Sequence, residues 1–543
     1  MSQIEFQALC DTVGKVYTDK VADIQRVAER GLYVVNHHLS QSVDTEESVV
    51  LSLHAVRGAT ADGDRASRSG RHETALVCYS RALSYLPIFH KEAAPALVGR
   101  AKCFIQLNQF DRAKETIDLV LQLDPFSSGA YSCRGEIDEK LGEPEQAMQH
   151  YVTAFILDGS RSTEHAAAID RAARLVGRNA ARDIFSAMIV QHELPTKWLV
   201  QSYFDSFEHD VDYAICVPLD VEKNLTAEPS TQTAEQLVYR AVHYKRKREY
   251  HDAQASISAA LQLEFADEAM HAIALNLHAS FLYVVGDVHA AVVAISESIA
   301  LNPSSVNALV KKGGFLSEVG DMEDAQACFD AALKLDPNEA DVYLHMGQKE
   351  LLEGKFYEAV QCLRRSISRS EALPVTHVSY GMALYKSGSS YQAVDVFEEA
   401  ARAFPNSPEV HLFYGEVLAD QGDYAGAMKH FLKSFELSPL CPLPFLNAGR
   451  VYVSTNDPLR AIAHFEQALA IDPRCSSAHL DIAQVLFAQG RTTEAFAHFD
   501  LAARCCRFLP EVEEVCAAKE MARMQERVTD ILGVDLRHIM RSK

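Results

Sequence analysis

Three groups of residues in this chain have types and spacings that could do chemistry. His37 and His38 are adjacent potential metal ligands, but no third ligand follows at helical spacing, and 22 histidines make such a pair common by chance. The 12 cysteines include no Cys-x-x-Cys pair, only the neighbours Cys505 and Cys506, which indicates buried thiols in a reducing compartment. No glycine-rich loop is spaced to cradle a phosphate. We therefore predict no catalytic residues, no metal and no cofactor.

The third group is a basic run, Lys245-Arg246-Lys247-Arg248, in a chain whose formal net charge is -22. Nucleic-acid binding needs a basic surface that neutralises phosphates, so this overall charge argues against a nucleic-acid partner. The run is predicted to be a solvated loop between two helices. Contact with acidic lipid headgroups or with a protein partner is the alternative.

The elements that position these residues follow from a 34-residue period that begins at Ala272. The eighth position of each unit is small: Ala279, Gly313, Gly347, Gly381, Gly415, Gly449 and Ala483. The twentieth position is alanine: Ala291, Ala325, Ala359, Ala393, Ala427, Ala461 and Ala495. The thirty-second is mostly proline: Pro303, Pro337, Pro405, Pro439 and Pro473. This pattern is typical of tetratricopeptide (TPR) repeats, in which small residues let two antiparallel helices approach and proline follows the second helix.

Three earlier units begin near Val56, Ala94 and Ser128, and a degenerate unit near Ala234 precedes the regular ones. We therefore predict an all-α TPR superhelical solenoid of about eleven helix-turn-helix repeats in a three plus eight arrangement. The predicted domains are an N-terminal helical extension (1–50), a three-repeat TPR domain (51–161), a helical bridge and linker (162–233), an eight-repeat TPR array (234–509) and a C-terminal capping helix (510–543). Too few residues lie outside the repeats to build a catalytic domain, so we predict that the protein is not an enzyme.

The concave side of the larger array is the predicted binding surface, lined by positions 2, 5, 9 and 12 of each first helix. The candidate groove residues are Leu344, Gln348, Leu351, Val378, Met382, Tyr385, Leu412, Leu446, Arg450 and Phe487. Position 5 is apolar throughout the regular units from Val310 on, which suits hydrophobic or amphipathic client segments. The alternative is that position 5 packs against the neighbouring repeat and belongs to the core.

Several stretches lie outside the repeat consensus. They are Ile156-Leu157-Asp158-Gly159, Arg174-Leu175-Val176-Gly177, Ser202-Tyr203-Phe204-Asp205-Ser206-Phe207, and Asn338 to Tyr343 running into His345-Met346-Gly347-Gln348. With the three plus eight division, they resemble the large TPR import receptor of the mitochondrial outer-membrane translocase, from about residue 50 onward. The resemblance implies a receptor on the cytosolic face of that membrane that binds preproteins in its larger array and works with other translocase subunits. A cytosolic TPR scaffold or co-chaperone that organises a protein complex is the alternative.

Two departures from that family change what we expect. Its members carry an N-terminal transmembrane helix, whereas no run here approaches the roughly 20 apolar residues that span a bilayer, so we expect no transmembrane segment in this chain. Its members also grip the terminal carboxylates of chaperones with lysine, arginine and asparagine side chains. The matching positions are Thr60, Asp64, Gly99, Gly129 and Cys133, which include no cation.

We therefore predict that a peptide with an acidic chaperone-type C-terminus binds weakly or not at all. Two carboxylates need several converging cationic and amide donors, and Asp64 would repel them. Isothermal titration calorimetry against the free-acid peptide and its C-terminally amidated form tests this. Micromolar binding of the free acid that amidation abolishes would contradict the prediction.

Overall fold

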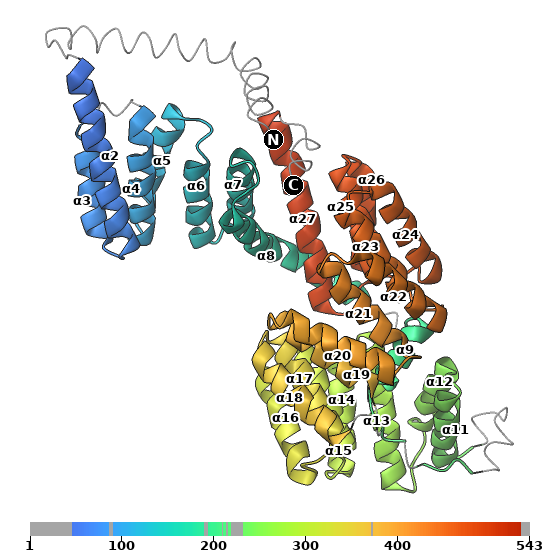
Figure 1. The fold of residues 1–543 in the computed structure, drawn as a ribbon. Coiled ribbons are helices and arrows are strands. Elements are labelled where there is room, and N and C mark those ends of the chain that lie inside the picture. The colour runs from blue at the N-terminus through green and yellow to red at the C-terminus, as the bar shows by residue number, and fades with distance from the viewer. Residues whose placement is uncertain are drawn as a thin grey trace. The chain divides into compact units, whose positions relative to one another are not determined.

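The computed structural model of the protein describes residues 46–85, 91–188, 194–208, 210–212, 215–218, 232–370 and 373–533. Every regular element within those residues is a helix (Figure 1). Most of the predicted extension at 1–50 lies outside them, as do His37 and His38. The chain divides into two compact units, one holding residues up to Asp183 with Leu486–Phe499 and Val512–Lys543, the other Ile184–Val485 with Asp500–Glu511.

The first unit contains three helical hairpins followed by a long helix. Its helices are α2 (Glu46–Arg68), α3 (His72–Leu83), the 3-10 turn η1 (Lys91–Ala93), α4 (Ala94–Gln106), α5 (Phe110–Leu123), α6 (Ser128–Leu141), α7 (Pro144–Leu157) and α8 (Thr163–Met188). Tyr79, Leu97, Ile117 and Ile137 are buried in the core that the hairpins share. Stacking the hairpins thus buries apolar faces that no single hairpin could bury alone.

The C-terminal helix α27 (Leu509–Leu532) contributes most of its length to this first unit. Its apolar residues Ala517, Met524 and Val528 pack with Tyr151 of α7 and with α8. Gly177 of α8 permits this approach, because a Cβ there would lie 2.9 Å from the Ala517 backbone nitrogen. The described part of the predicted capping helix, Leu509–Leu532, therefore covers α7 and α8.

The second unit begins with a short helix and continues as helical hairpins. Its helices are α9 (Lys197–Phe204), α11 (Ala234–Arg246), α12 (Tyr250–Ala260), α13 (Glu268–Val285), α14 (Val288–Leu301), α15 (Val306–Val319), α16 (Met322–Leu335), α17 (Ala340–Leu352), α18 (Phe356–Arg369), α19 (Pro374–Lys386), α20 (Ser390–Ala403), α21 (Pro408–Asp420), α22 (Tyr424–Leu437), α23 (Leu443–Ser454), α24 (Pro458–Ile471), α25 (Ser476–Ala488) and α26 (Thr492–Cys505), the last two reaching into the first unit. We call the odd-numbered members α11 to α25 the first helices, and the surface that they line the inner face.

One contact recurs within the hairpins of both units. The glycine at position 8 of the first helix lies directly under the large side chain at position 24 of the second. A Cβ on Gly313 would approach Phe329 to 2.7 Å, and one on Gly381 would approach Phe397 to 2.6 Å. Phe329 and Phe397 are fully buried. The periodic glycines therefore set how closely the two helices of a hairpin pack.

A second recurrent contact uses serine at position 27 of alternate repeats. The hydroxyls of Ser298 and Ser366 donate to the carbonyls of Ala272 and Ala340, at 2.7 and 2.9 Å. Ser434 donates to the carbonyl of Pro408 at 2.8 Å. These buried bonds join the second helix of a hairpin to the start of the first, and they explain why a polar residue is accepted there.

The adjacent residues Gly313 and Gly314 of α15 allow a matched test of the glycine contact. Gly313→Ala should destabilise the protein by about 1–3 kcal/mol, because the methyl group collides with the Phe329 ring. Gly314→Ala should be neutral or stabilise it by about 0.5–1 kcal/mol, because no atom lies within 4 Å of its Cβ and alanine favours helix. Urea denaturation of both variants measures the difference. Equal stabilities would contradict the packing role of Gly313.

Candidate functional site

The first part of the inner face is covered by the chain itself. Residues 194–217, which we call the internal segment (209, 213 and 214 are not described), lie against α11, α13, α15 and α17. Phe204 stacks on Tyr250 with ring centroids 5.8 Å apart and meets Phe281 of α13 edge-on at 5.4 Å. Phe207 stacks on His345 of α17 at 4.8 Å. The aromatic stretch Ser202 to Phe207 thus packs against the helices of the array as part of the same chain.

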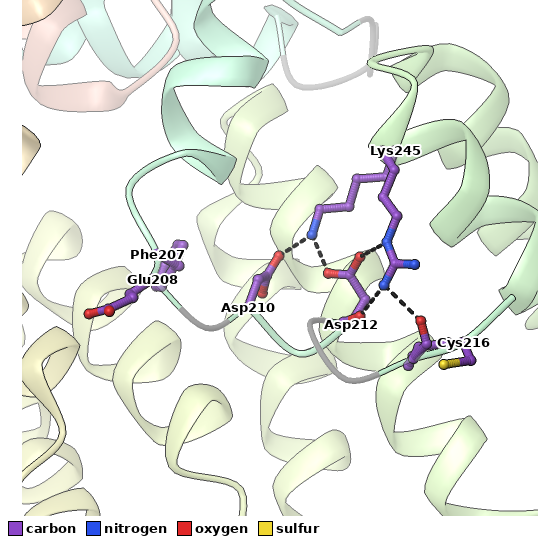
Figure 2. A pocket seen from close by; sticks show the side chains of 8 residues that line it. Phe207, Glu208, Asp210, Asp212, Cys216 and Lys245 are labelled. Atoms are coloured by element: carbon purple, nitrogen blue, oxygen red, sulfur yellow. Dashed lines mark hydrogen bonds and ion pairs between the residues drawn. The ribbon is translucent and has the colours of Figure 1, made fainter. Parts of the chain in front are cut away.

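Two buried carboxylates of the internal segment pair with two lysines of the first helices. Asp210 and Asp212 both form ion pairs with Lys245 of α11 (Figure 2). Lys311 of α15 donates to Asp210 at 2.6 Å. Lys311 also donates to the Asn276 side-chain oxygen at 2.8 Å and the Ser280 hydroxyl at 2.9 Å. All three protons of its ammonium group are therefore matched by acceptors.

The electrostatics of this cluster follow from burial and pairing. Burial alone would raise the pKa of Asp210, but Lys311 and Lys245 hold that pKa well below its usual range. Burial lowers the pKa of Lys311, because loss of hydration outweighs the attraction of Asp210. Burial acts on Lys245 in the same direction, yet Asp210 and Asp212 together raise its pKa. Both carboxylates are paired with cations, since Lys245 contacts both of them, Lys311 contacts Asp210 and Arg246 lies 3.8 Å from Asp212, so the cluster anchors the segment.

The basic run is consequently not a solvated loop at its first two residues. Lys245 and Arg246 end α11, and the Lys245 side chain is buried against the carboxylates. Arg246 donates to the backbone carbonyls of Asp212 and Ile215 at 2.7 and 2.8 Å. An open pocket of about 480 Å³ beside them is lined by Glu208, Cys216, Asp210, Asp212 and Lys245 (Figure 2). No sequence pattern predicts these pairs, because the partners lie more than thirty residues earlier in an irregular stretch.

Five of the predicted groove residues belong to the core. Leu344, Val378, Leu412, Leu446 and Phe487 are at most 4% exposed. Leu344, for example, packs in one cluster with Leu363 of its own hairpin and Ala383 of the next. Their side chains fill the space between neighbouring hairpins, so they do not line an open groove, and the core alternative describes position 5.

The other candidates lie half-buried or exposed on first helices: Gln348, Leu351, Met382, Tyr385 and Arg450. Tyr385 and Arg450 belong to a set of polar contacts that we call the polar ladder, whose members are Tyr385, Glu416, Asp420, Asn447, Arg450 and Asp481.

Each rung of the polar ladder joins one first helix to the next. Burial and the nearby Asp420 carboxylate of α21 raise the pKa of Tyr385 of α19. Asn447 of α23 donates to Glu416 of α21 at 2.6 Å, and Arg450 of α23 donates to Asp481 of α25 at 2.7 Å. Burial raises the pKa of Glu416 and of Asp481. The ladder offers a row of donors and acceptors to an extended chain laid across the first helices.

Comparison with known proteins identifies the type of repeat. Tetratricopeptide repeat family models match residues 94–127 and 306–339, and a second such model matches 381–439 and 446–510. The protein is a tetratricopeptide-repeat solenoid. The number and grouping of its repeats remain the prediction made above.

Individual relatives of this solenoid are import receptors. It is 24% identical over 273 residues to the human mitochondrial import receptor subunit TOM70, covering 48% of this chain and 44% of that protein. The mouse protein of the same name gives 24% over 288 residues, 51% of this chain and 45% of that protein. The chain thus spans less than half the length of these relatives. The crystal structure of yeast Tom70 has the same fold, with a TM-score of 0.50 and 21% identity over 88% of this chain and 98% of that one.

The solenoid has no described helix long and apolar enough to cross a membrane. Its described residues also hold no group of three or more histidine, cysteine, aspartate or glutamate side chains placed to bind a metal ion.

The positions matched to the chaperone clamp lie on α2, α4 and α6: Thr60, Asp64, Gly99, Gly129 and Cys133. The Tyr79 hydroxyl donates to Asp64 at 2.7 Å, and the same ring packs directly on Gly99. The Cys133 thiol is buried, which raises its pKa to about 12. These contacts are within the fold, and none of the five side chains supplies a cation.

A double-mutant cycle tests the buried cluster. Lys311→Met and Asp210→Asn should each destabilise the protein by about 3–5 kcal/mol, because each strands buried polar partners. The double variant should lose less than the sum, because its two changes remove one shared interaction. Urea denaturation provides the free energies. Arg402→Ala, at an exposed pair with Glu398, is the control and should change stability by less than about 1 kcal/mol; additive losses at Lys311 and Asp210 would refute the pairing.

Proposed function

We propose that this TPR solenoid is a non-catalytic receptor that binds extended segments of client proteins along the inner face of α19, α21, α23 and α25. The proposed clients are mitochondrial preproteins, and the proposed place is the cytosolic face of the mitochondrial outer membrane. Binding is reversible, since a receptor that hands its client on must release it.

The polar ladder is the observation that carries this proposal. The internal segment contacts α11 to α17, whereas the ladder lies on the four first helices that follow. Arg450 keeps half of its side-chain surface exposed even while it bonds Asp481. The exposed side chains of Asp420 and Arg450, together with the half-buried Tyr385 and Met382, suit a peptide backbone with alternating side chains.

The relatives support the choice of client. Those matched in sequence are named as mitochondrial import receptor subunits, although the match spans less than half of their length. A cytosolic TPR scaffold or co-chaperone is the second candidate. The five matched clamp positions of the first unit carry no cation, which argues against chaperone docking as its main role. Fractionation of the tagged protein separates the two. Recovery with the outer membrane supports the receptor, and a wholly cytosolic pool that ignores loss of the translocase supports the scaffold.

A matched pair of variants tests the binding surface. Asp420→Ala with Arg450→Ala removes one anion and one cation from the ladder and should weaken binding of a purified mitochondrial preprotein at least tenfold. Glu398→Ala with Arg402→Ala removes the same charges from α20, a second helix, and should leave the affinity unchanged. Fluorescence anisotropy with labelled preprotein measures both. Equal affinities in the two double variants would exclude the ladder as the binding surface.

A further inference from the structure

Gly314 of α15 is a residue that the packing of the fold does not require. Glycine inside a helix costs roughly 1 kcal/mol relative to alanine. Its neighbour Gly313 is explained by the Phe329 ring, whereas a Cβ on Gly314 would meet no atom within 4 Å. The following repeats carry long side chains at the same position 9, namely Gln348, Met382, Glu416, Arg450 and Gln484.

The missing side chain leaves a hollow of about 120 Å³ on the inner face of α15 and α17. Phe315, Val310 and Leu352 form its apolar walls, and the internal segment closes one side with Tyr203 and Phe207. Leu352 is 57% exposed, so the hollow has an exposed apolar residue in its lining. Its size is close to the roughly 150 Å³ of an apolar cavity that holds benzene.

Two polar atoms in the lining lack partners of normal geometry. Nε2 of His345 and Oη of Tyr203 are both buried and make no such hydrogen bond within the described residues, although Gln348 and Ser280 stand close to them. Burial lowers the pKa of His345 to about 4, so its ring is neutral at physiological pH. A neutral histidine and a tyrosine hydroxyl can each donate to or accept from one uncharged polar group.

We propose that the hollow over Gly314, on the inner face of α15 and α17 next to the client surface of α19 to α25, is a subsite for one side chain of a bound client. It takes one neutral client side chain that has an apolar or aromatic body and a single hydrogen-bonding tip. The body fills the space that position 9 leaves empty in α15, and the tip pairs with His345 or Tyr203. This inference rests on the proposed function, because the side chain is taken to belong to a bound client.

The probe 4-fluorophenol, followed by its ¹⁹F NMR signal, tests the subsite directly. It should bind the wild-type protein saturably, and fluorobenzene, which lacks the hydroxyl, should bind at least threefold more weakly. Gly314→Leu should weaken 4-fluorophenol at least tenfold, because leucine fills the hollow. Gly58→Leu is the matched control, since Gly58 lies exposed within α2 with the same open surroundings.

Gly314→Ala is a second variant that keeps the test valid if the larger Gly314→Leu variant misfolds. It should fold normally and still weaken 4-fluorophenol binding severalfold. Binding that is unchanged in both Gly314 variants would overturn the subsite. Preprotein affinity then separates this inference from the proposed function. If the wild-type protein binds preprotein and Gly314→Leu binds it equally well, the subsite is wrong and the receptor stands. If the wild-type protein binds no preprotein, the receptor is wrong, and the client subsite falls with it even where 4-fluorophenol enters the hollow.

Discussion

The close approach of a large side chain to a glycine holds the regular hairpins of this protein together. Phe329 over Gly313 and Phe397 over Gly381 leave no room for even a methyl group. This contact fixes the distance between the two helices, and stacking then places the first helices side by side. The inner face exists because of that stacking. Its chemistry is consequently decided at the positions that packing leaves free, such as Gly314 and Arg450.

The internal segment divides this inner face into two parts of different character. Over α11 to α17 the face is filled by aromatic rings and by paired charges that are largely buried. Removing one member of a buried charge pair strands the other, so the segment is an integral part of the array. Over α19 to α25 the polar groups bond across neighbouring first helices, and two of them, Asp420 and Arg450, keep exposed surface. The contrast explains why client binding is assigned to the second part.

Some features of this protein follow from its sequence, and others do not. The period placed Gly313 and the hairpins, and the helical bridge predicted at 162–233 includes the helix that the structure shows as α8. From the sequence, Leu412 and Leu446 fit both a groove lining and a core position, because an apolar stripe has the same pattern in either role. The predicted solvated loop was wrong for Lys245, because its partners Asp210 and Asp212 lie outside any periodic element. The serine bonds at position 27 did leave a signal, a polar residue in every second repeat.

The sequence by itself determined the TPR fold, because a period of small and large residues is a local demand of helix packing that recurs in every unit. It also predicts weak chaperone docking by the first unit, since no cation stands at the matched clamp positions. Only the tertiary structure decided which side chains face outward, which charges pair, and where the internal segment lies. Those outcomes depend on contacts between residues far apart in the chain, such as Lys311 with Asp210, and no local pattern records them.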